Sequence, residues 1–374
     1  MWKPQKIYAD FLLDQPVILF GERSVFGLTS FPGAKVAVIY GNSFGMDGKQ
    51  QIQKVFSKRA VHFIPRSWKS EPDLDSLGPV VRALEAFAPD VILAVGGGAV
   101  LDGAKLCRVL YEFPSFRYGE TRLDQLTFKT KLIAVPTTIG SGAEASSAAV
   151  FIDHTQHRKE MVVSHGLRPD VVILDPFFVS AAPYQLLAVS GMDAAAHILE
   201  GYVSKVNNAL TDILAEQALR ILIEGLSQTN ITTVNFLRLQ YAGYLGGIIQ
   251  NHCLVGAAHG IAHQVPDFGY SHAEAVALLL PAVIRQNQKD EQTFSRYQML
   301  SSATGLGGIT DVIAFLEQLH ERIGLSVRKD KLRQLLLQQV GRDEFVSNVN
   351  RDSGGSGNPV PVDENYLKQL LGDF

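Results

Sequence analysis

Short apolar runs alternate with stretches of helical periodicity through the first 180 residues of the chain. The runs cover residues 36–40, 61–64, 91–95 and 131–135, and helical patterns cover 47–59, 74–87 and 99–111. Further β-like runs lie at 148–152, 160–164 and 171–174. A strand buried on both faces reads as a continuous apolar run, and a helix is the usual connection between parallel strands. The alternation predicts a Rossmann-like α/β domain with a doubly wound parallel sheet.

The pattern changes after Asp175-Pro176, where helical periodicity rich in alanine and leucine replaces the strand patterns. Candidate helices cover residues 184–204, 211–226, 236–253, 273–288 and 316–323. We therefore expect an α/β domain at 1–180 and an all-helical domain at 181–374. The Gly/Ser-rich segment 353–359 is predicted to be a loop before one last helix.

Composition excludes several classes of protein. The 374 residues carry a formal net charge of −3, which gives no electrostatic argument for binding nucleic acid or an anionic membrane. The two cysteines, Cys107 and Cys253, lie in apolar surroundings and are typical of a reducing compartment. The first residues form no apolar run typical of a signal sequence, so we expect none, and no apolar run of about 20 residues predicts a membrane span. We expect a cytoplasmic protein.

Three glycines, Gly96, Gly97 and Gly98, lie where a predicted strand meets a predicted helix. Without Cβ atoms, the backbone N–H groups of such a turn can approach a diphosphate, and the helix N-terminus adds favourable partial charge. Asp102 follows in the first turns of the helix and is a candidate to orient the loop or to contact the nicotinamide ribose. Alone, the glycines are equally consistent with a tight turn that binds nothing.

A second polar segment, residues 136–144, follows the next strand and contains Thr137, Thr138 and Ser141. Open α/β sheets bind ligands at the carboxyl ends of their strands, and hydroxyl groups suit phosphate and ribose contacts. A Ser/Thr helix cap is the alternative. Because both segments lie at strand ends, the sequence predicts that the 1–180 domain binds a dinucleotide.

The first of the strands ends at Gly41, Asn42 and Ser43, with no carboxylate. Selection of NAD usually needs an acidic residue there to accept from the ribose 2′-hydroxyl. Small and hydroxyl groups leave room for a 2′-phosphate, so NADP is favoured over NAD. The alternative is that the carboxylate of Asp47 reaches the ribose 2′-hydroxyl, which would favour NAD.

Polar side chains in the helical half have the spacing of a metal site. Asp193 and His197 are four residues apart, as are His259 and His263, and His272 follows. Residues four apart share one face of a helix. One carboxylate with several imidazoles suits a divalent cation, and the ligand types do not distinguish Fe(II) from Zn(II). A single histidine of this kind would more often be an ordinary core or surface residue.

A divalent cation beside a nicotinamide predicts hydride chemistry. The cation favours an alkoxide, which releases hydride far more readily than an alcohol does, and in reverse it polarises an aldehyde. His263, one turn from His259, is the candidate proton relay.

Together these residues resemble the iron-containing (group III) alcohol dehydrogenase family, which shares its fold with dehydroquinate synthase. The resemblance runs over nearly the whole chain. It is carried by residues 96–99 with Asp102, by 136–144, by 191–197, by 259–263 and by 357–359. It implies four metal ligands, Asp193, His197, His259 and His272, and a lysine near the cofactor, Lys159. A homodimer is also plausible for this family.

The chain departs from the family pattern at Ala99, where serine is usual, and at Ala273, where glycine is usual. Residues 250–255 also lack the common pattern before His259. The resemblance implies a primary alcohol or aldehyde as substrate. Because these departures change the substrate-side loops, a specialised polyol, sugar acid or phosphonate aldehyde is also among the options.

Two other functions fit parts of the sequence. A lyase or cyclase similar to dehydroquinate synthase would use NAD transiently, but few basic residues lie near the ligand positions to hold an acidic substrate. The third hypothesis is a sensor that binds dinucleotide without catalysis. Such a protein would not need the metal ligands, and their presence in this chain argues against it. The leading hypothesis is a metal-dependent, NAD(P)-dependent alcohol dehydrogenase or aldehyde reductase.

Overall fold

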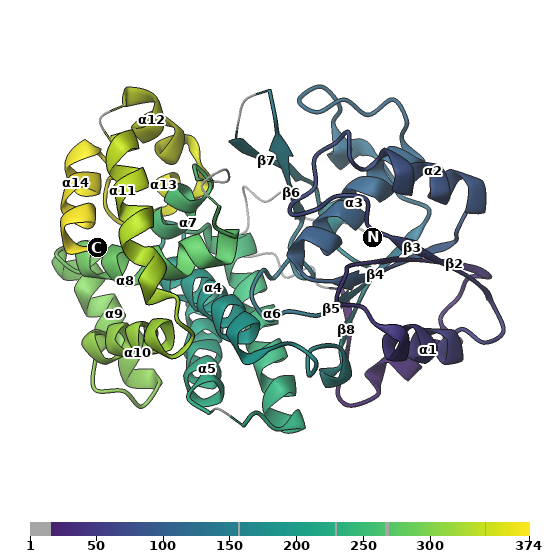
Figure 1. Cartoon of the computed structure of the whole chain (residues 1–374), viewed down its shortest axis with the longest axis horizontal. Coiled ribbons are helices and arrows are strands. Elements are labelled where there is room, and N and C mark those ends of the chain that lie inside the picture. The colour runs from purple at the N-terminus through teal and green to yellow at the C-terminus, as the bar shows by residue number, and fades with distance from the viewer. Residues whose placement is uncertain (1–15, 156–157, 229, 266–268, 341) are drawn as a thin grey trace. The chain divides into compact units, whose positions relative to one another are not determined.

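The computed structural model describes residues 16–155, 158–228, 230–265, 269–340 and 342–374. These residues form two compact units. The α/β unit comprises 16–182 and 232–244, and the helical unit comprises 183–231 and 245–374. Both are shown in Figure 1, where strands β2 to β8 are labelled.

Six parallel strands form the sheet of the α/β unit. They are β1 (Val17–Phe20), β2 (Lys35–Tyr40), β3 (Ala60–Pro65), β4 (Val91–Gly96), β5 (Lys131–Pro136) and β8 (Val171–Leu174). Their order is β1-β8-β5-β4-β2-β3, and every pairing is parallel. All six residues of β4 are buried, as expected for a central strand covered on both faces. The predicted fold class is confirmed.

Helices connect these strands. They are α1 (Met46–Val55), α2 (Gly78–Phe87) and α3 (Gly98–Glu112), with the 3-10 helices η2 (Ser24–Ser30), η3 (Leu123–Gln125), η4 (His165–Leu167) and η5 (Pro176–Phe178). The edge strand β1 was not predicted, although Val17–Phe20 is a short apolar run like those of the other strands. The runs at 148–152 and 160–164 do not join the sheet. They form a separate antiparallel hairpin, β6 (Ala148–Asp153) and β7 (Arg158–Val163).

The second unit is helical, as predicted. Its elements are α4 (Tyr184–Val203), α5 (Ala209–Leu226), α7 (Ala257–Ala262), α8 (His272–Asn287), α9 (Glu291–Ala303), α10 (Ile309–Arg322), η6 (Ser326–Arg328), α11 (Lys329–Val340), α12 (Asp343–Arg351), α13 (Ser353–Gly357) and α14 (Glu364–Asp373). Helix α6 (Thr233–Cys253) contributes residues to both units. From residue 187 to its end, α4 is buried on every side, which accounts for its small and apolar residues.

The Gly/Ser-rich segment was predicted to be a loop, and this was wrong in part. The short helix α13 forms there because the Asp352 side chain accepts a hydrogen bond from Gly354 N at its start. Glycine in a helix is costly in isolation, so tertiary packing stabilises this turn. Gly355 is packed so closely that a Cβ would lie 2.0 Å from the carbonyl oxygen of Val349.

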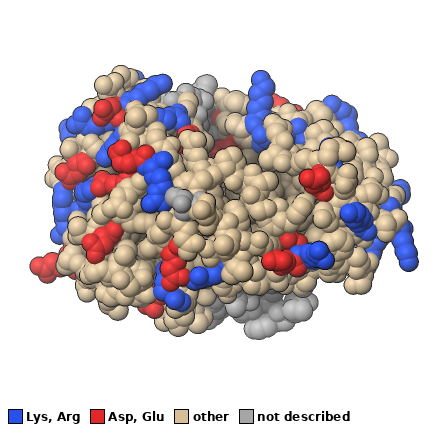
Figure 2. Space-filling model, turned by 60° about the horizontal axis from the view of Figure 1, so that its bottom comes forward, with Lys and Arg blue, Asp and Glu red and all other residues tan. Residues whose placement is uncertain are grey.

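Acidic and basic side chains are interspersed on the face shown in Figure 2. Among the described ranges, no helix combines the length and the hydropathy needed to cross a membrane.

Candidate functional site

Three predicted ligands come together in the helical unit. Asp193 and His197 lie on α4 and His259 lies on α7, and one ligand atom from each falls within 4.8 Å of the others. All three residues are buried. The rings of His197 and His259 stack with centroids 4.5 Å apart, and His259 Nε2 lies 3.6 Å from Asp193 Oδ1. The four-residue spacing on α4 places the first two side chains on one face, as expected.

Glu200, one turn after His197 on α4, fixes the ring of His259. Its Oε2 lies 2.5 Å from His259 Nδ1, and its Oε1 accepts from Ala258 N at 2.7 Å. Burial alone would lower the pKa of His259, but the charges of Glu200 and Asp193 raise it to about 9. Glu200 was not predicted as a site residue, although its position one turn from His197 on the same helical face was a usable signal.

The donor set fits a divalent metal. Among the described residues, His259 Nε2 is buried and has no hydrogen-bond partner, while its other nitrogen is held by Glu200. A buried nitrogen in this state normally costs free energy unless a ligand satisfies it. Carboxylate and imidazole groups at these separations suit Fe(II) or Zn(II).

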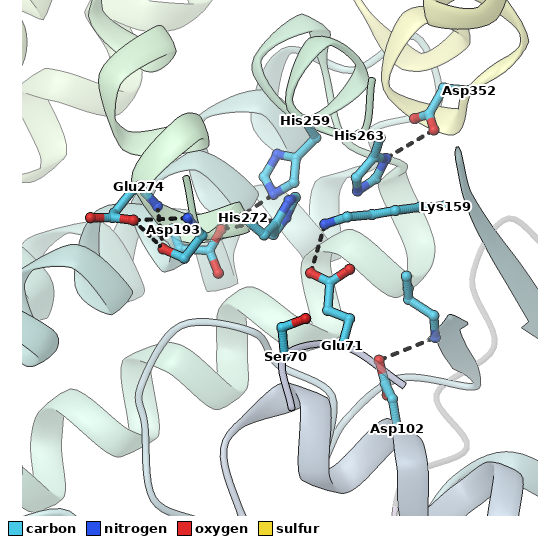
Figure 3. Close-up of polar contacts among 12 residues, drawn as sticks. Ser70, Glu71, Asp102, Lys159, Asp193, His259, His263, His272, Glu274 and Asp352 are labelled. Carbon is cyan, nitrogen blue, oxygen red and sulfur yellow. Dashed lines mark hydrogen bonds and ion pairs between the residues drawn. The ribbon is translucent and has the colours of Figure 1, made fainter. Parts of the chain in front are cut away.

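His272 lies beside the three-residue cluster but outside it. Its Nε2 is 3.9 Å from Asp193 Oδ1, and its ring is stacked on that of His263 at 4.9 Å (Figure 3). His272 is the first residue of α8, whose start is fixed because the side chains of Ser271 and Glu274 cap each other's backbone N–H groups.

His263 is held by Asp352, a residue that the sequence analysis did not single out. The His263 Nδ1 and Asp352 Oδ2 atoms are 2.9 Å apart (Figure 3). Burial would raise the pKa of Asp352, but the charge and hydrogen bond of His263 lower it below the usual range. A carboxylate at Nδ1 makes that nitrogen the proton donor and leaves Nε2 as the acceptor.

Helix α7, which carries His259, is anchored by Asn358. The Asn358 side chain is fully buried, and its Oδ1 accepts from Ala257 N at 3.2 Å and from Asn287 Nδ2 at 3.0 Å. Tyr366 donates to Asn287 Oδ1 at 2.8 Å. This buried network ties the start of α7 to α8 and α14.

In the α/β unit, the two predicted cofactor segments meet. A Cβ on Gly98 would lie 2.7 Å from Ser141 Cβ, and one on Gly97 would lie 3.2 Å from Thr138 Oγ1. Thr137 N donates to Gly96 O at 3.0 Å. The glycine turn thus lies against the hydroxyl-rich loop at the carboxyl ends of β4 and β5.

The end of β2 reaches the same edge of the sheet. Gly41 N donates to Val95 O at 3.2 Å, and Gly41 is buried, whereas Asn42 and Ser43 are exposed. Three adjacent strands, β2, β4 and β5, therefore bring these predicted residues to one edge.

Asp102 and Lys159 make contacts within the protein. Asp102 accepts from Val150 N at 3.2 Å and pairs with the buried Lys105 at 3.3 Å, which ties α3 to the β6–β7 hairpin. Lys159 Nζ lies 2.6 Å from Glu71 Oε1 (Figure 3). Both side chains are therefore held by other protein groups.

Comparison with known proteins decides the family. Residues 16–176 match the model of the iron-containing alcohol dehydrogenase family, and residues 187–373 match the C-terminal model of Fe-containing alcohol dehydrogenases. The chain belongs to the iron-containing alcohol dehydrogenase family. The family predicted from the sequence is confirmed.

Relatives in this family differ in length. An aldehyde-alcohol dehydrogenase of Streptococcus pneumoniae (strain TIGR4) is 30% identical over 303 residues, which are 72% of this chain and 34% of that protein. The chain thus spans about a third of the length of such relatives. The NADPH-dependent butanol dehydrogenase of Clostridium saccharobutylicum is 29% identical and covers 95% of both chains. The structure of an iron-containing alcohol dehydrogenase from Thermococcus thioreducens matches with a TM-score of 0.85, at 26% identity over 95% of this chain and 97% of that one.

Proposed function

We propose that this chain is a metal-dependent, NAD(P)-dependent alcohol dehydrogenase that interconverts a primary alcohol and its aldehyde. The observation that carries the proposal is the buried group of Asp193, His197 and His259, in which Glu200 holds the outer nitrogen of His259. Membership of the iron-containing alcohol dehydrogenase family supports the same chemistry.

The four candidate ligands are Asp193, His197, His259 and His272, which would bind Fe(II) or Zn(II). When bound, the metal would polarise the oxygen of the alcohol or aldehyde, and NAD(P) would accept or deliver the hydride. Glu200 keeps the proton of His259 on Nδ1, so that Nε2 presents its lone pair as a ligand.

His263 is the proposed proton carrier. Asp352 holds the ring through Nδ1, so that Nε2 can accept the proton of the alcohol and return it in the reverse reaction. The carboxylate of Asp352 stabilises the imidazolium while the proton is held.

Residues 1–180 would bind the dinucleotide, and residues 181–374 would bind the metal and the substrate. The proposed phosphate contacts are backbone N–H groups of Gly96, Gly97 and Gly98 with the hydroxyls of Thr137, Thr138 and Ser141. Gly41, Asn42 and Ser43 would lie at the adenosine ribose. Asp102 and Lys159, which are held by contacts within the protein, would position the segments around the cofactor. Assembly as a homodimer stays a prediction.

The substrate is proposed only as a class. The similar chain of C. saccharobutylicum is named for butanol, which favours a simple primary alcohol. The changes at Ala99 and Ala273 keep a polyol, a sugar acid or a phosphonate aldehyde among the candidates.

The test replaces His259 and His272 together by alanine. We expect loss of bound metal by elemental analysis and loss of NADPH- or NADH-dependent turnover across a panel of aldehydes. His154→Ala, at a side chain that is 70% exposed, is the matched control and keeps both. Unchanged metal content and turnover in the double variant would refute the proposal.

A further inference from the structure

Two cationic side chains meet the carboxyl ends of β2 and β3. The two strands are neighbours, with Tyr40 in register with Pro65, and Arg66 N donates to Tyr40 O at 3.0 Å. On the other side of β2 lies β4, which ends in the glycine turn. In a sheet of this order, a dinucleotide whose diphosphate lies at the β4 turn extends its adenosine ribose over the end of β2.

Lys49 projects from α1 to this place. Its Nζ donates to Tyr40 Oη at 3.0 Å and lies 4.3 Å from the centre of the Tyr40 ring. Among the described residues, the contacts of the Lys49 ammonium are these two with Tyr40, and neither involves a carboxylate. Contact with an aromatic ring holds the long side chain in place without neutralising its charge.

Arg66 is the second cation, and its charge is also uncompensated. Its Nη1 donates to Ser70 O at 3.3 Å, while Nε is buried and has no hydrogen-bond partner in the part of the chain that the structure describes. Burial lowers the pKa of this guanidinium. The buried Nε–H group cannot reach a ligand, so the terminal Nη groups of this partly exposed guanidinium are the donors available to an anion.

The nearby carboxylate of Asp47 does not neutralise either cation. Asp47 in the first turn of α1 is exposed, and it makes no ion pair with Lys49 or Arg66. The residues directly after β2, Gly41, Asn42 and Ser43, carry no charge.

We propose that Lys49 and Arg66 bind the 2′-phosphate of NADP and make this chain selective for NADP over NAD. The proposal rests on the proposed function, because it assumes that the glycine turn holds a dinucleotide. A phosphate monoester is the group that an ammonium and a guanidinium recognise together, and the ribose hydroxyl of NAD offers them no charge. Tyr40 positions Lys49 by holding its ammonium through Oη and the ring face.

The test measures binding of two fragments to the full-length, metal-loaded protein by calorimetry. The probes are adenosine 5′-monophosphate and adenosine 2′,5′-bisphosphate, which differ only in the 2′-phosphate. We expect the bisphosphate to bind roughly tenfold or more tightly, with a preference that shrinks as salt is raised. NADPH and NADH, followed by their fluorescence, should show the same order.

Substitutions assign the effect to the two residues. Lys49→Met and Arg66→Met should each weaken the bisphosphate about tenfold and leave the monophosphate unchanged. Arg66→Lys should restore part of the loss if charge is what matters. Lys54→Met, at an exposed lysine of the same helix, is the matched control and should change neither ligand.

Equal affinity for the two fragments, or a bisphosphate affinity that both methionine variants retain, would overturn the assignment of these cations. If NADH still binds in that case, the proposed function stands and only the role of Lys49 and Arg66 is overturned. Binding of neither NADH nor NADPH would overturn the proposed function together with this proposal.

Discussion

Glu200 and His259 are 59 positions apart in the chain, yet a carboxylate oxygen of the first lies 2.5 Å from Nδ1 of the second. The other carboxylate oxygen accepts from the backbone of Ala258, so Glu200 fixes both the ring of His259 and the helix that carries it. A carboxylate behind a histidine in this way sets which ring nitrogen is available to a metal.

Replacing Glu200 by glutamine should weaken metal binding. The amide cannot hold the Nδ1 proton as a carboxylate does, so the Nε2 ligand atom loses its fixed orientation. We expect metal affinity to fall roughly 10–100-fold, measured by competition with a chromophoric chelator. Glu321→Gln, at an exposed carboxylate of α10, is the control. An affinity for metal that is the same in both variants would show that Glu200 has no such role.

Replacing Asn358 by alanine should destabilise the helical unit. Ala257 N and the Asn287 side chain would both lose a buried partner. We expect the free energy of unfolding in urea to fall by roughly 2 kcal/mol, since an unsatisfied buried polar group costs about 1–3 kcal/mol. Gln338→Ala, at an exposed side chain of α11, serves as comparison. Equal stability of the two variants would count against the network.

Two glycines of α6 should respond differently to alanine. A Cβ on Gly243 would lie 2.1 Å from the backbone oxygen of Ile139, within the loop that carries Thr138 and Ser141, whereas the nearest atom to a Cβ on Gly246 is at 3.4 Å. Gly243→Ala should cost about 1–3 kcal/mol of unfolding free energy and weaken NADPH binding. Gly246→Ala should be neutral or gain up to about 1 kcal/mol. Similar melting temperatures for the two would contradict this packing.

The stability of the protein should fall in mild acid partly through His320. Burial lowers the pKa of His320 to about 4, and its Nε2 donates to Ala277 O. The unfolded chain has the usual value near 6.5, so between these values the unfolded state binds the extra proton and stability falls as pH falls.

From pH 7 to pH 5, this group should cost about 2 kcal/mol. The measurement is urea unfolding at both pH values in the native protein and in His320→Gln, which keeps an N–H donor but cannot titrate. We expect the loss of stability to be smaller in the variant by that amount. An identical pH dependence would exclude His320 as the cause.

Local sequence patterns were sufficient to predict features that lie within a single helix or strand. The apolar runs of β2, β4 and β5 predicted the parallel sheet, because a strand covered on both faces must be apolar throughout. The spacing of Asp193 and His197 predicted two ligand candidates on one helical face. The edge strand β1 was missed although its four residues are all apolar.

The sequence by itself therefore determined the class of fold, the family and the residue types of the metal cluster, since these depend on periodicity and on short motifs. Only the tertiary structure decided that Glu200 holds His259, that Asp352 holds His263 and that Lys49 lies on Tyr40. These contacts join elements that are distant in sequence, and helix packing and strand order set their distances. A local sequence pattern contains no information about them.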